Sequence, residues 1–288
     1  MSKMRSQYRR YTRSKAGNVM YFIVLALAGA FSILPLIYCV ITSFKPLDEL
    51  LIFPPQFFVR RPTLSNYIAL PSLLNKLMVP MSRYIFNSLF VALTSTFFHI
   101  IAASLAAFAF SKSKLKFRKT LFLLVQVMLL YNAYTLAVPQ YLIFSKLNII
   151  DTYFVYILPA IPSAMGCFLM KQFIDVGVPD ALLEAARIDG ANVFRVYWQI
   201  IMPMVKPAWM TLLLFSFRDM WSIVPAGTIF SEELKTLPQV MSTVTAGGIA
   251  RTGSSMALTV LLMIPPIIVF MISQSHVIET MSSSGIKE

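Results

Sequence analysis

Few residues of this 288-residue chain have the types and spacing that catalysis or metal binding requires. The two histidines, His99 and His276, have no second metal-ligating side chain nearby in sequence, and both cysteines, Cys39 and Cys167, lie within apolar runs. The pattern G-x-x-x-x-G-K-S/T, which cradles nucleotide phosphates, does not occur. A membrane-embedded enzyme would need a nucleophile with its base, or a metal cluster. We therefore expect a chain that is not itself an enzyme and binds no cofactor or metal.

The chemistry of recognition is concentrated in residues 178–190 instead. Pro179 suits the first position of a helix, and Asp180 lies in the first turn, where the helix dipole favours an acid. Gly190 stands just past the end, where a helix commonly stops. These signals predict a short helix in a polar loop.

The middle of this helix has the composition of a docking surface. Ala185 and Ala186 leave almost no side chain, so another protein can approach the backbone closely, while Glu184 and Arg187 add charges at the rim. Such a helix suits a groove on a partner protein. Composition alone leaves open the alternative of a surface helix that merely connects two spans, since amphipathic helices at membrane surfaces are common.

A second helix is predicted directly after Gly190. Its apolar residues recur at the spacing of one helical stripe, and they are Val193, Val196, Tyr197, Ile200 and Ile201. Arg195 and Gln199 fall on the other face, and Pro203 and Pro207 end the helix. We expect this helix to pack along the inner edge of a helix bundle.

Polar and aromatic side chains at membrane depth form two clusters that suit a sugar, which is bound by hydrogen-bonding groups and aromatic faces. The members of the two clusters are Gln126, Tyr131, Asn132 and Tyr134, and Arg218, Asp219 and Trp221. Either cluster could line a substrate path. Mutual pairing is an equally good interpretation of Arg218 and Asp219, because charges inside membranes are commonly paired. Asn87 and Ser88 are expected to pack between spans and not to bind substrate.

Membrane spans are the elements that position these residues. Hydrophobic residues make up 57% of the chain and charged residues 13%, and the mean hydropathy is +0.71. A spanning helix needs about 20 apolar residues, because backbone amides must be paired internally where water is absent. The segments that meet this requirement are Val19–Ile41, Tyr84–Phe110, Leu121–Phe144, Thr152–Met170, Ala208–Phe230 and Met256–Ser273. We predict an all-α membrane protein with six transmembrane helices in residues 19–275.

Basic loops give the orientation of these spans. Residues 1–18 and the loop after the second span contain Lys and Arg but no acid, and short basic loops stay in the cytoplasm. The basic N-terminus (1–18), the coupling loop (171–207) and the tail (276–288) are then cytoplasmic, and a compact loop after the first span lies outside. The net charge of +13 reflects this topology and not nucleic-acid binding, because the basic residues flank spans.

Longer motifs add a family resemblance. The run EAARIDGA at 184–191, followed by IIMP at 200–203, resembles the EAA signature of the permease subunits of binding-protein-dependent ABC importers. Further stretches resemble the sugar-importer class related to the maltose permease of the G type, and they are SFKP at 43–46, PTLSNY at 62–67, NSL at 87–89 and LAAFAFSK at 105–112. This resemblance covers nearly the whole chain.

The resemblance implies the type I importer permease fold and an importer of five parts in a prokaryotic plasma membrane. Those parts are two different six-span permeases, a cytoplasmic ATPase dimer that binds ATP and Mg, and an external solute-binding protein that delivers a carbohydrate, an oligosaccharide. It also implies that Glu184 pairs with a cation on the ATPase and that Ala185 and Ala186 permit close approach. Asp189, Gly190 and Ala191 would complete the coupling set at the turn into the second helix.

An ion-coupled secondary transporter of a small polar solute is the competing class. It should show repeated halves and discontinuous helices with acids at the midplane. We find no convincing internal repeat, and Asp219 is the one acid deep in a predicted span. The sequence therefore favours the importer.

Overall fold

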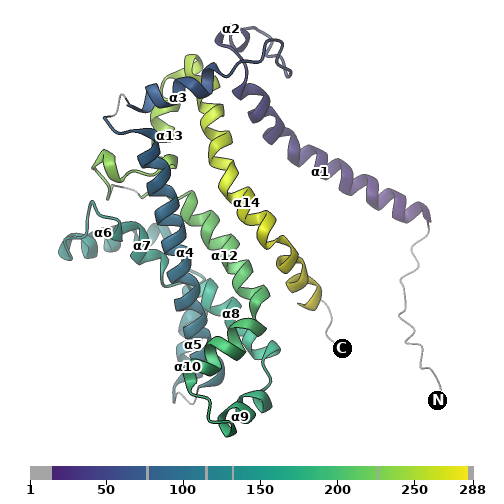
Figure 1. Ribbon diagram of the computed structural model, residues 1–288, viewed down its shortest axis with the longest axis vertical. Helices are drawn as coiled ribbons and strands as arrows, with labels where there is room; N and C mark the ends of the chain where they lie inside the picture. The colour runs from purple at the N-terminus through teal and green to yellow at the C-terminus, as the bar shows by residue number, and fades with distance from the viewer. Residues whose placement is uncertain (1–14, 76–77, 114–115, 132, 226, 285–288) are drawn as a thin grey trace.

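The computed structural model describes residues 15–75, 78–113, 116–131, 133–225 and 227–284, which form helices joined by loops (Figure 1). The α-helices are α1 (Lys15–Ser43), α2 (Leu47–Leu50), α3 (Ser65–Asn75), α4 (Met81–Lys112), α5 (Arg118–Met128), α6 (Ala137–Lys146), α7 (Phe154–Ala160), α8 (Ala164–Gly177), α9 (Asp180–Ile188), α10 (Val193–Arg195), α11 (Met202–Met204), α12 (Lys206–Trp221), α13 (Leu237–Thr245) and α14 (Thr252–Ser284). Short 3-10 helices cover Ala133–Leu136, Glu232–Leu234 and Gly248–Arg251, and a π-helical segment covers Val196–Ile201. The all-α prediction is confirmed for these residues.

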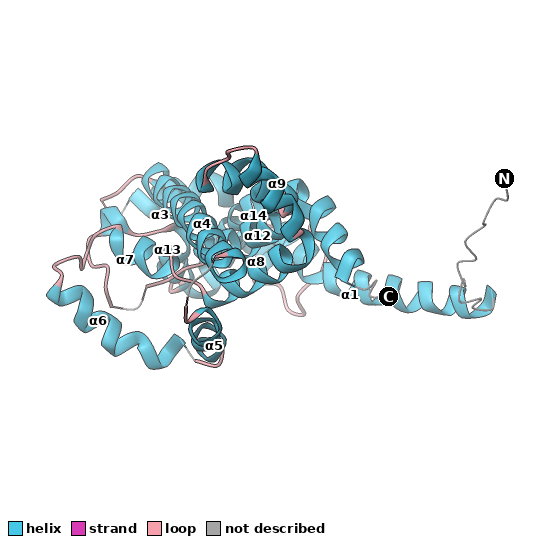
Figure 2. Ribbon diagram, turned by 90° about the horizontal axis from the view of Figure 1, so that it is seen from below, coloured by secondary structure: helices cyan, strands magenta, loops and turns pink. Residues whose placement is uncertain are grey.

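α4 is the central helix of the bundle. It packs against α8 and α12, and α12 packs in turn against α14. The buried face of α4 is made mostly of small side chains, which let neighbouring helices approach closely, and it includes Ser88, Ala92, Ser95, Ala103, Ser104 and Ala107. Seen along its length, the bundle has α6 on one side and α1 on the other (Figure 2).

Among the described residues, four helical stretches are long and apolar enough to cross a membrane, and they are Gly17–Ser43, Met81–Lys112, Phe154–Gly177 and Gly248–Ser275. They match the first, second, fourth and sixth predicted spans. A fifth crossing is obtained if Val193–Met204 and Lys206–Trp221, which meet at a bend of 80°, count as one span. Six crossings therefore remain a prediction.

The prediction of one continuous third span over residues 121–144 is wrong. α5 ends at Met128, a 3-10 turn follows, and α6 begins only at Ala137. Tyr131 and Thr135 interrupt the apolar run here, and hydroxyl side chains such as that of Thr135 compete with the backbone for hydrogen bonds. Hydropathy therefore predicted a single helix where the structure has two, α5 and α6.

The predicted fifth span also ends too late. α12 stops at Trp221, whereas the prediction extended to Phe230. Pro225 has no amide to donate to a helical hydrogen bond, and Gly227 has a φ of +66°, which is left-handed backbone. Both residues direct the chain into a loop that leads to α13.

Asn87 and Ser88 pack between elements, as predicted. The side-chain amide of Asn87 is fully buried and donates to the carbonyl oxygens of Glu233 and Lys235, both at 2.8 Å, while its Oδ1 accepts from the hydroxyl of Tyr153 at 2.7 Å. Ser88 accepts a backbone amide from the start of α13 at 2.8 Å. These contacts join α4 to the loop that follows α12.

The predicted compact loop after α1 is also present. The buried carboxylate of Glu49 accepts the backbone amides of Arg60 at 3.0 Å and of Arg61 at 2.8 Å. α2, α3 and α13 lie at this end of the molecule, and α9 lies at the other end (Figure 1).

Candidate coupling site

α9 begins almost where the sequence predicts. Pro179 precedes it as the N-cap residue with extended backbone, at φ −62° and ψ 139°. The helix thus starts one residue later than predicted, and Asp180 lies in the first turn as predicted. An acid there faces the positive end of the helix dipole.

Gly190 closes α9 in the left-handed conformation. Its φ is +76°, its amide donates to the carbonyl of Arg187 at 3.1 Å, and the amide of Ala191 donates to the carbonyl of Ala186 at 2.9 Å. These two hydrogen bonds form the Schellman motif, which satisfies carbonyl groups at a helix end. No atom of the described residues lies within 4 Å of a Cβ added at residue 190. The glycine is therefore required by the backbone conformation and not by crowding.

One face of α9 is packed against the bundle. Leu183 and Ala186 are buried in an apolar cluster that also contains Ala107 of α4, Ile174 of α8 and Ala208 of α12. Ala186 was predicted to face a partner protein, and that assignment is wrong, because it lies one helical turn after Leu183 and on the same side. Its small side chain instead lets α9 approach its own bundle closely.

The opposite face of α9 is open. Glu184, Ala185 and Arg187 are exposed, and Ile188 has 86% of its surface exposed. Asp189, the C-cap residue, is exposed as well. The helix therefore presents a small residue, charges of both signs and one large apolar side chain while its other face is fixed.

Lys112 ties the beginning of α9 to the end of α4. Its side chain is only 8% exposed, and its Nζ donates to the carbonyl of Val178 and to Oδ1 of Asp180, both at 2.7 Å. In the sequence, Lys112 indicated the membrane orientation and belonged to a stretch of family resemblance, but its contact with the start of α9 was not predicted. The sequence did contain a signal for this contact. Lys112 lies near the end of the second predicted span and Asp180 at the start of the predicted loop helix, on the same side of the membrane.

The same contact lowers the pKa of the Asp180 carboxyl below its ordinary value, first through the hydrogen bond from Lys112 and second through the charge of Lys112. The carboxyl is 80% exposed, so solvent screens the ion pair and its contribution to stability is small. Its main effect is geometric, because it fixes where α9 starts relative to α4.

The second predicted helix follows Gly190, with altered geometry. Asn192 caps it by accepting the amide of Arg195 at 2.8 Å, and α10, the π-helical segment and α11 then follow one another. Pro203 does not end the helix, contrary to the prediction. The wide π-helical turn just before it relieves the clash of a proline ring with the carbonyl four residues earlier. The 80° bend comes later, at Val205.

The predicted apolar stripe of this segment faces the bundle over most of its length. Val196, Tyr197 and Ile201 are buried and Ile200 is half-buried, whereas Val193 is exposed. The Tyr197 hydroxyl lies 2.5 Å from the Ser104 hydroxyl of α4, and on the other face Arg195 donates to Gln199 at 2.9 Å.

The first cluster proposed for a substrate path is only partly described. Gln126 and Tyr131 are exposed. Asn132 lies outside the described residues, and so does the side chain of Tyr134.

The second cluster separates into an ion pair and a packing residue. Arg218 Nη2 lies 3.3 Å from Asp219 Oδ1, with side chains 68% and 57% exposed, so the pairing interpretation is confirmed. Trp221 is 4% exposed, donates from Nε1 to the carbonyl of Leu262 at 2.8 Å, and stacks on Phe217. Its placement in the substrate path is corrected, because almost no ring surface is left for a solute.

The described residues thus form an apolar helical bundle with α9 at one end, buried on one face and exposed on the other. Residues 58–283 match the family of binding-protein-dependent transport system inner membrane components. Since this match covers most of the chain, the chain belongs to that family and is a membrane permease component.

Two relatives match over nearly their whole length. The chain is 28% identical over 275 residues to the sulfoquinovosyl glycerol transport system permease of Agrobacterium fabrum, covering 94% of this chain and 95% of the relative. It is 25% identical over 284 residues to the arabinooligosaccharides transport system permease of Halalkalibacterium halodurans, covering 92% and 95%.

A solved structure shares the fold. It is a bacterial ABC transporter involved in the import of the acidic polysaccharide alginate, with a TM-score of 0.76 at 22% identity over 92% of this chain and 99% of that chain. A second structure contains the alginate transporter with an alginate pentasaccharide-bound periplasmic protein, with a TM-score of 0.50 at 15% identity over 73% and 86%. At these identities the likeness shows the fold alone.

Proposed function

We propose that the chain is one permease subunit of an ATP-driven carbohydrate importer. The carbohydrate is an oligosaccharide that an external solute-binding protein delivers. Relatives named for a sulfoquinovosyl glycerol and for arabinooligosaccharides support the substrate class, as does the fold shared with the alginate importer. A carbohydrate-loaded periplasmic protein in the related complex supports the delivery step.

One observation carries the coupling role: α9 has one face fixed in the bundle and one face open. A partner ATPase, which binds ATP and Mg, would receive the open face, with Glu184 against a cation and Ala185 at the closest approach. Leu183 and Ala186 join α9 to a cluster shared by α4, α8 and α12. A displacement of α9 is therefore passed to three helices of the bundle, which biases a two-state transition between inward-open and outward-open forms.

The topology that we propose has six crossings, with residues 1–18, the coupling loop 171–207 and the tail 276–288 in the cytoplasm. Residues 121–144 would supply the third crossing through a broken helix, and α12 (Lys206–Trp221) would supply the fifth. The exposure of α1 supports the presence of a second permease subunit. The membrane-spanning part of α1 has a mean hydropathy of 2.4 and is 0% buried within this chain. Such a surface must face lipid or another subunit.

The substrate path would lie between the two permeases. Gln126, Tyr131, Asn132 and Tyr134 come from one broken span, and the paired Arg218 and Asp219 from another. The exposure of Gln126, Tyr131 and the ion pair within this single chain supports that location. A carbohydrate would meet hydrogen-bonding groups there together with aromatic faces.

The test uses the complete transporter in lipid vesicles with its solute-binding protein. Glu184→Lys and Ala185→Trp change exposed residues of α9, so we expect normal assembly of the permease pair but at least tenfold lower ATP hydrolysis stimulated by loaded binding protein. Glu233→Lys makes the same charge change at an exposed residue of the opposite end and should leave the stimulation unchanged. Unchanged stimulation in both α9 variants would show that α9 is not the coupling joint.

A further inference from the structure

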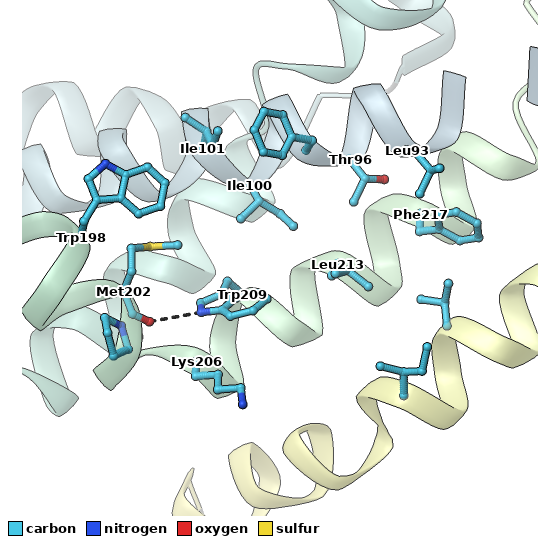
Figure 3. A pocket seen from close by; sticks show the side chains of 14 residues that line it. Leu93, Thr96, Ile100, Ile101, Trp198, Met202, Lys206, Trp209, Leu213 and Phe217 are labelled. Atoms are coloured by element: carbon cyan, nitrogen blue, oxygen red, sulfur yellow. Dashed lines mark hydrogen bonds between the residues drawn. The ribbon is translucent and has the colours of Figure 1, made fainter. Parts of the chain in front are cut away.

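A cavity of about 780 Å³ lies beside the C-terminal part of the coupling loop, residues 198–206 (Figure 3). Its walls come from α4, from the segment that includes Trp198 and Met202, from α12 and from α14. Trp209 closes one part of it and is held there because its Nε1 donates to the Met202 carbonyl at 3.1 Å, as the dashed line in Figure 3 marks.

The lining of this cavity is almost wholly hydrocarbon. Phe97, Leu213 and Ile272 are typical of it, and the hydroxyl of Thr96 is within hydrogen-bond reach of Ser216 at 3.4 Å. The cavity also opens sideways, since Phe97 is 58% exposed and Ile272 64% exposed. In a membrane, this opening faces hydrocarbon chains and not water.

One cation stands at the edge of the cavity. Lys206 is the first residue of α12, next to the bend at Val205, and it belongs to the cavity lining. Its side chain is exposed, and the described part of the chain offers its ammonium neither a carboxylate nor another hydrogen-bond partner. Trp198 and Trp209 line the same cavity, and indole rings favour the boundary between hydrocarbon and headgroups.

We propose that this cavity is a binding site for an anionic phospholipid of the cytoplasmic leaflet, with an acyl chain between α4, α12 and α14 and the phosphate at Lys206. The leaflet assignment rests on the proposed function, which places α9 and the start of α12 on the cytoplasmic side. Basic pockets between spans on that side are a recognised mode of lipid headgroup binding.

The volume favours a lipid over a transmembrane helix of another subunit. About 780 Å³ falls within the range of about 300–1,000 Å³ that encloses small ligands. A spanning helix about 30 Å long and 10–12 Å wide occupies on the order of 2,000 Å³ or more. The phosphate of an anionic lipid would in addition compensate the charge of Lys206.

The bound lipid would contact both the spans and the coupling loop, because Trp198, Met202 and Lys206 line the cavity together with residues of α4 and α14. It would therefore act where movement of α9 is passed to the bundle. Anionic lipid should support coupling through this site and not only as bulk membrane.

The test is lipid retention by the purified complete transporter, measured by native mass spectrometry with added phosphatidylglycerol or phosphatidylcholine. We expect the wild-type complex to retain phosphatidylglycerol preferentially and Lys206→Gln to retain it about fivefold less, the effect of one basic residue near a membrane surface. Leu213→Trp, which fills the cavity, should reduce retention of both lipids. Lys119→Gln removes an exposed charge from α5, which does not line the cavity, and should change nothing.

A photoreactive p-benzoylphenylalanine at position 97 identifies the occupant directly. Crosslinking to phosphatidylglycerol supports the proposal, and crosslinking to the second permease overturns it, as does equal lipid retention by the wild type and Lys206→Gln. Retention is measured without ATP or carbohydrate, so it does not depend on transport. If α9 variants leave coupling intact while Lys206→Gln loses lipid, only the proposed function fails.

Discussion

Replacing Gly190 by alanine isolates the conformational requirement at the end of α9. A Cβ added at Gly190 or at Gly177 enters open space, since none of the described residues has an atom within 4 Å of it. Of these two glycines, only Gly190 has a positive φ, at +76°. A residue with a Cβ pays about 1–2 kcal/mol in left-handed backbone. At Gly177, inside α8, alanine should be neutral or stabilise by about 0.4–1 kcal/mol, since it restricts the unfolded chain.

A penalty of about 1–2 kcal/mol raises the population with an unfastened α9 by about 5- to 30-fold. That state loses the hydrogen bonds from the amides of Gly190 and Ala191 to the carbonyls of Arg187 and Ala186. Asparagine at position 190 should cost less than alanine, because it tolerates left-handed backbone better. Proline should cost most, because it cannot adopt a positive φ and has no amide.

Hydrogen exchange measured by mass spectrometry on peptides covering residues 178–195 reports this fraying directly. Exchange should be slowest in the wild type and become faster in the order Gly190→Asn, Gly190→Ala and Gly190→Pro. Gly177→Ala should exchange no faster than wild type. Stimulated ATP hydrolysis by the complete transporter should fall in the same order. Exchange in Gly190→Ala as slow as in wild type, or equal acceleration by Gly177→Ala, would refute the conformational requirement at residue 190.

Three further changes test the contacts around α4. Asn87→Ala should lower the free energy of unfolding by about 1–3 kcal/mol, since it leaves buried groups unpaired, and thermal unfolding in detergent checks this. Ser95→Ala is the control and should be neutral, because the buried Ser95 hydroxyl has no hydrogen-bond partner among the described residues. Lys112→Met should increase hydrogen exchange at the start of α9 more than Asp180→Asn does, because the lysine is buried and also holds the Val178 carbonyl; equal effects would contradict the assigned clamp. Because the pKa of Asp180 is lowered in the folded chain, its contribution to stability is complete above the ordinary aspartate pKa of about 3.9 and is lost as the pH falls through the lower folded value. The protection of amides at the start of α9, measured relative to the unfolded chain at the same pH, should therefore fall only below about pH 4. An identical pH profile of protection for Asp180→Asn would refute the pairing.

Local sequence signals were sufficient where a structural feature depends on a few neighbouring residues. Pro179, Asp180 and Gly190 placed α9 to within one residue, because capping and left-handed backbone are set by the residues at the helix ends. Long apolar runs located four spans for the same reason, since a continuous helix needs only enough apolar residues in succession.

Features that depend on distant residues were beyond this reasoning. Ala186 is buried because residues of distant helices, such as Ala107 and Ile174, belong to the same apolar cluster. Trp221 is buried beside α14, where its Nε1 donates to the carbonyl of Leu262. Lys112 meets Asp180 only after α4 and α8 have packed together. No local pattern records such pairings, so the inner and outer faces of α9 could be distinguished only in the folded chain.

In the proposed mechanism, the bend at Val205 would determine how a movement of α9 reaches the membrane. With 80° between the segment before it and α12, a push along one element becomes a sideways displacement of the other. Val205 itself is buried in the cluster that holds Leu183 and Ala186, so the bend and α9 belong to one packed unit and cannot move independently. Close-packed clusters switch between discrete arrangements and do not deform continuously. Since Met202 and Lys206 flank this bend and line the cavity, the volume open to a lipid must change whenever α9 is displaced. A lipid that fits one arrangement better would stabilise that arrangement by its difference in affinity for the two, which makes the cavity a site where the membrane can bias transport.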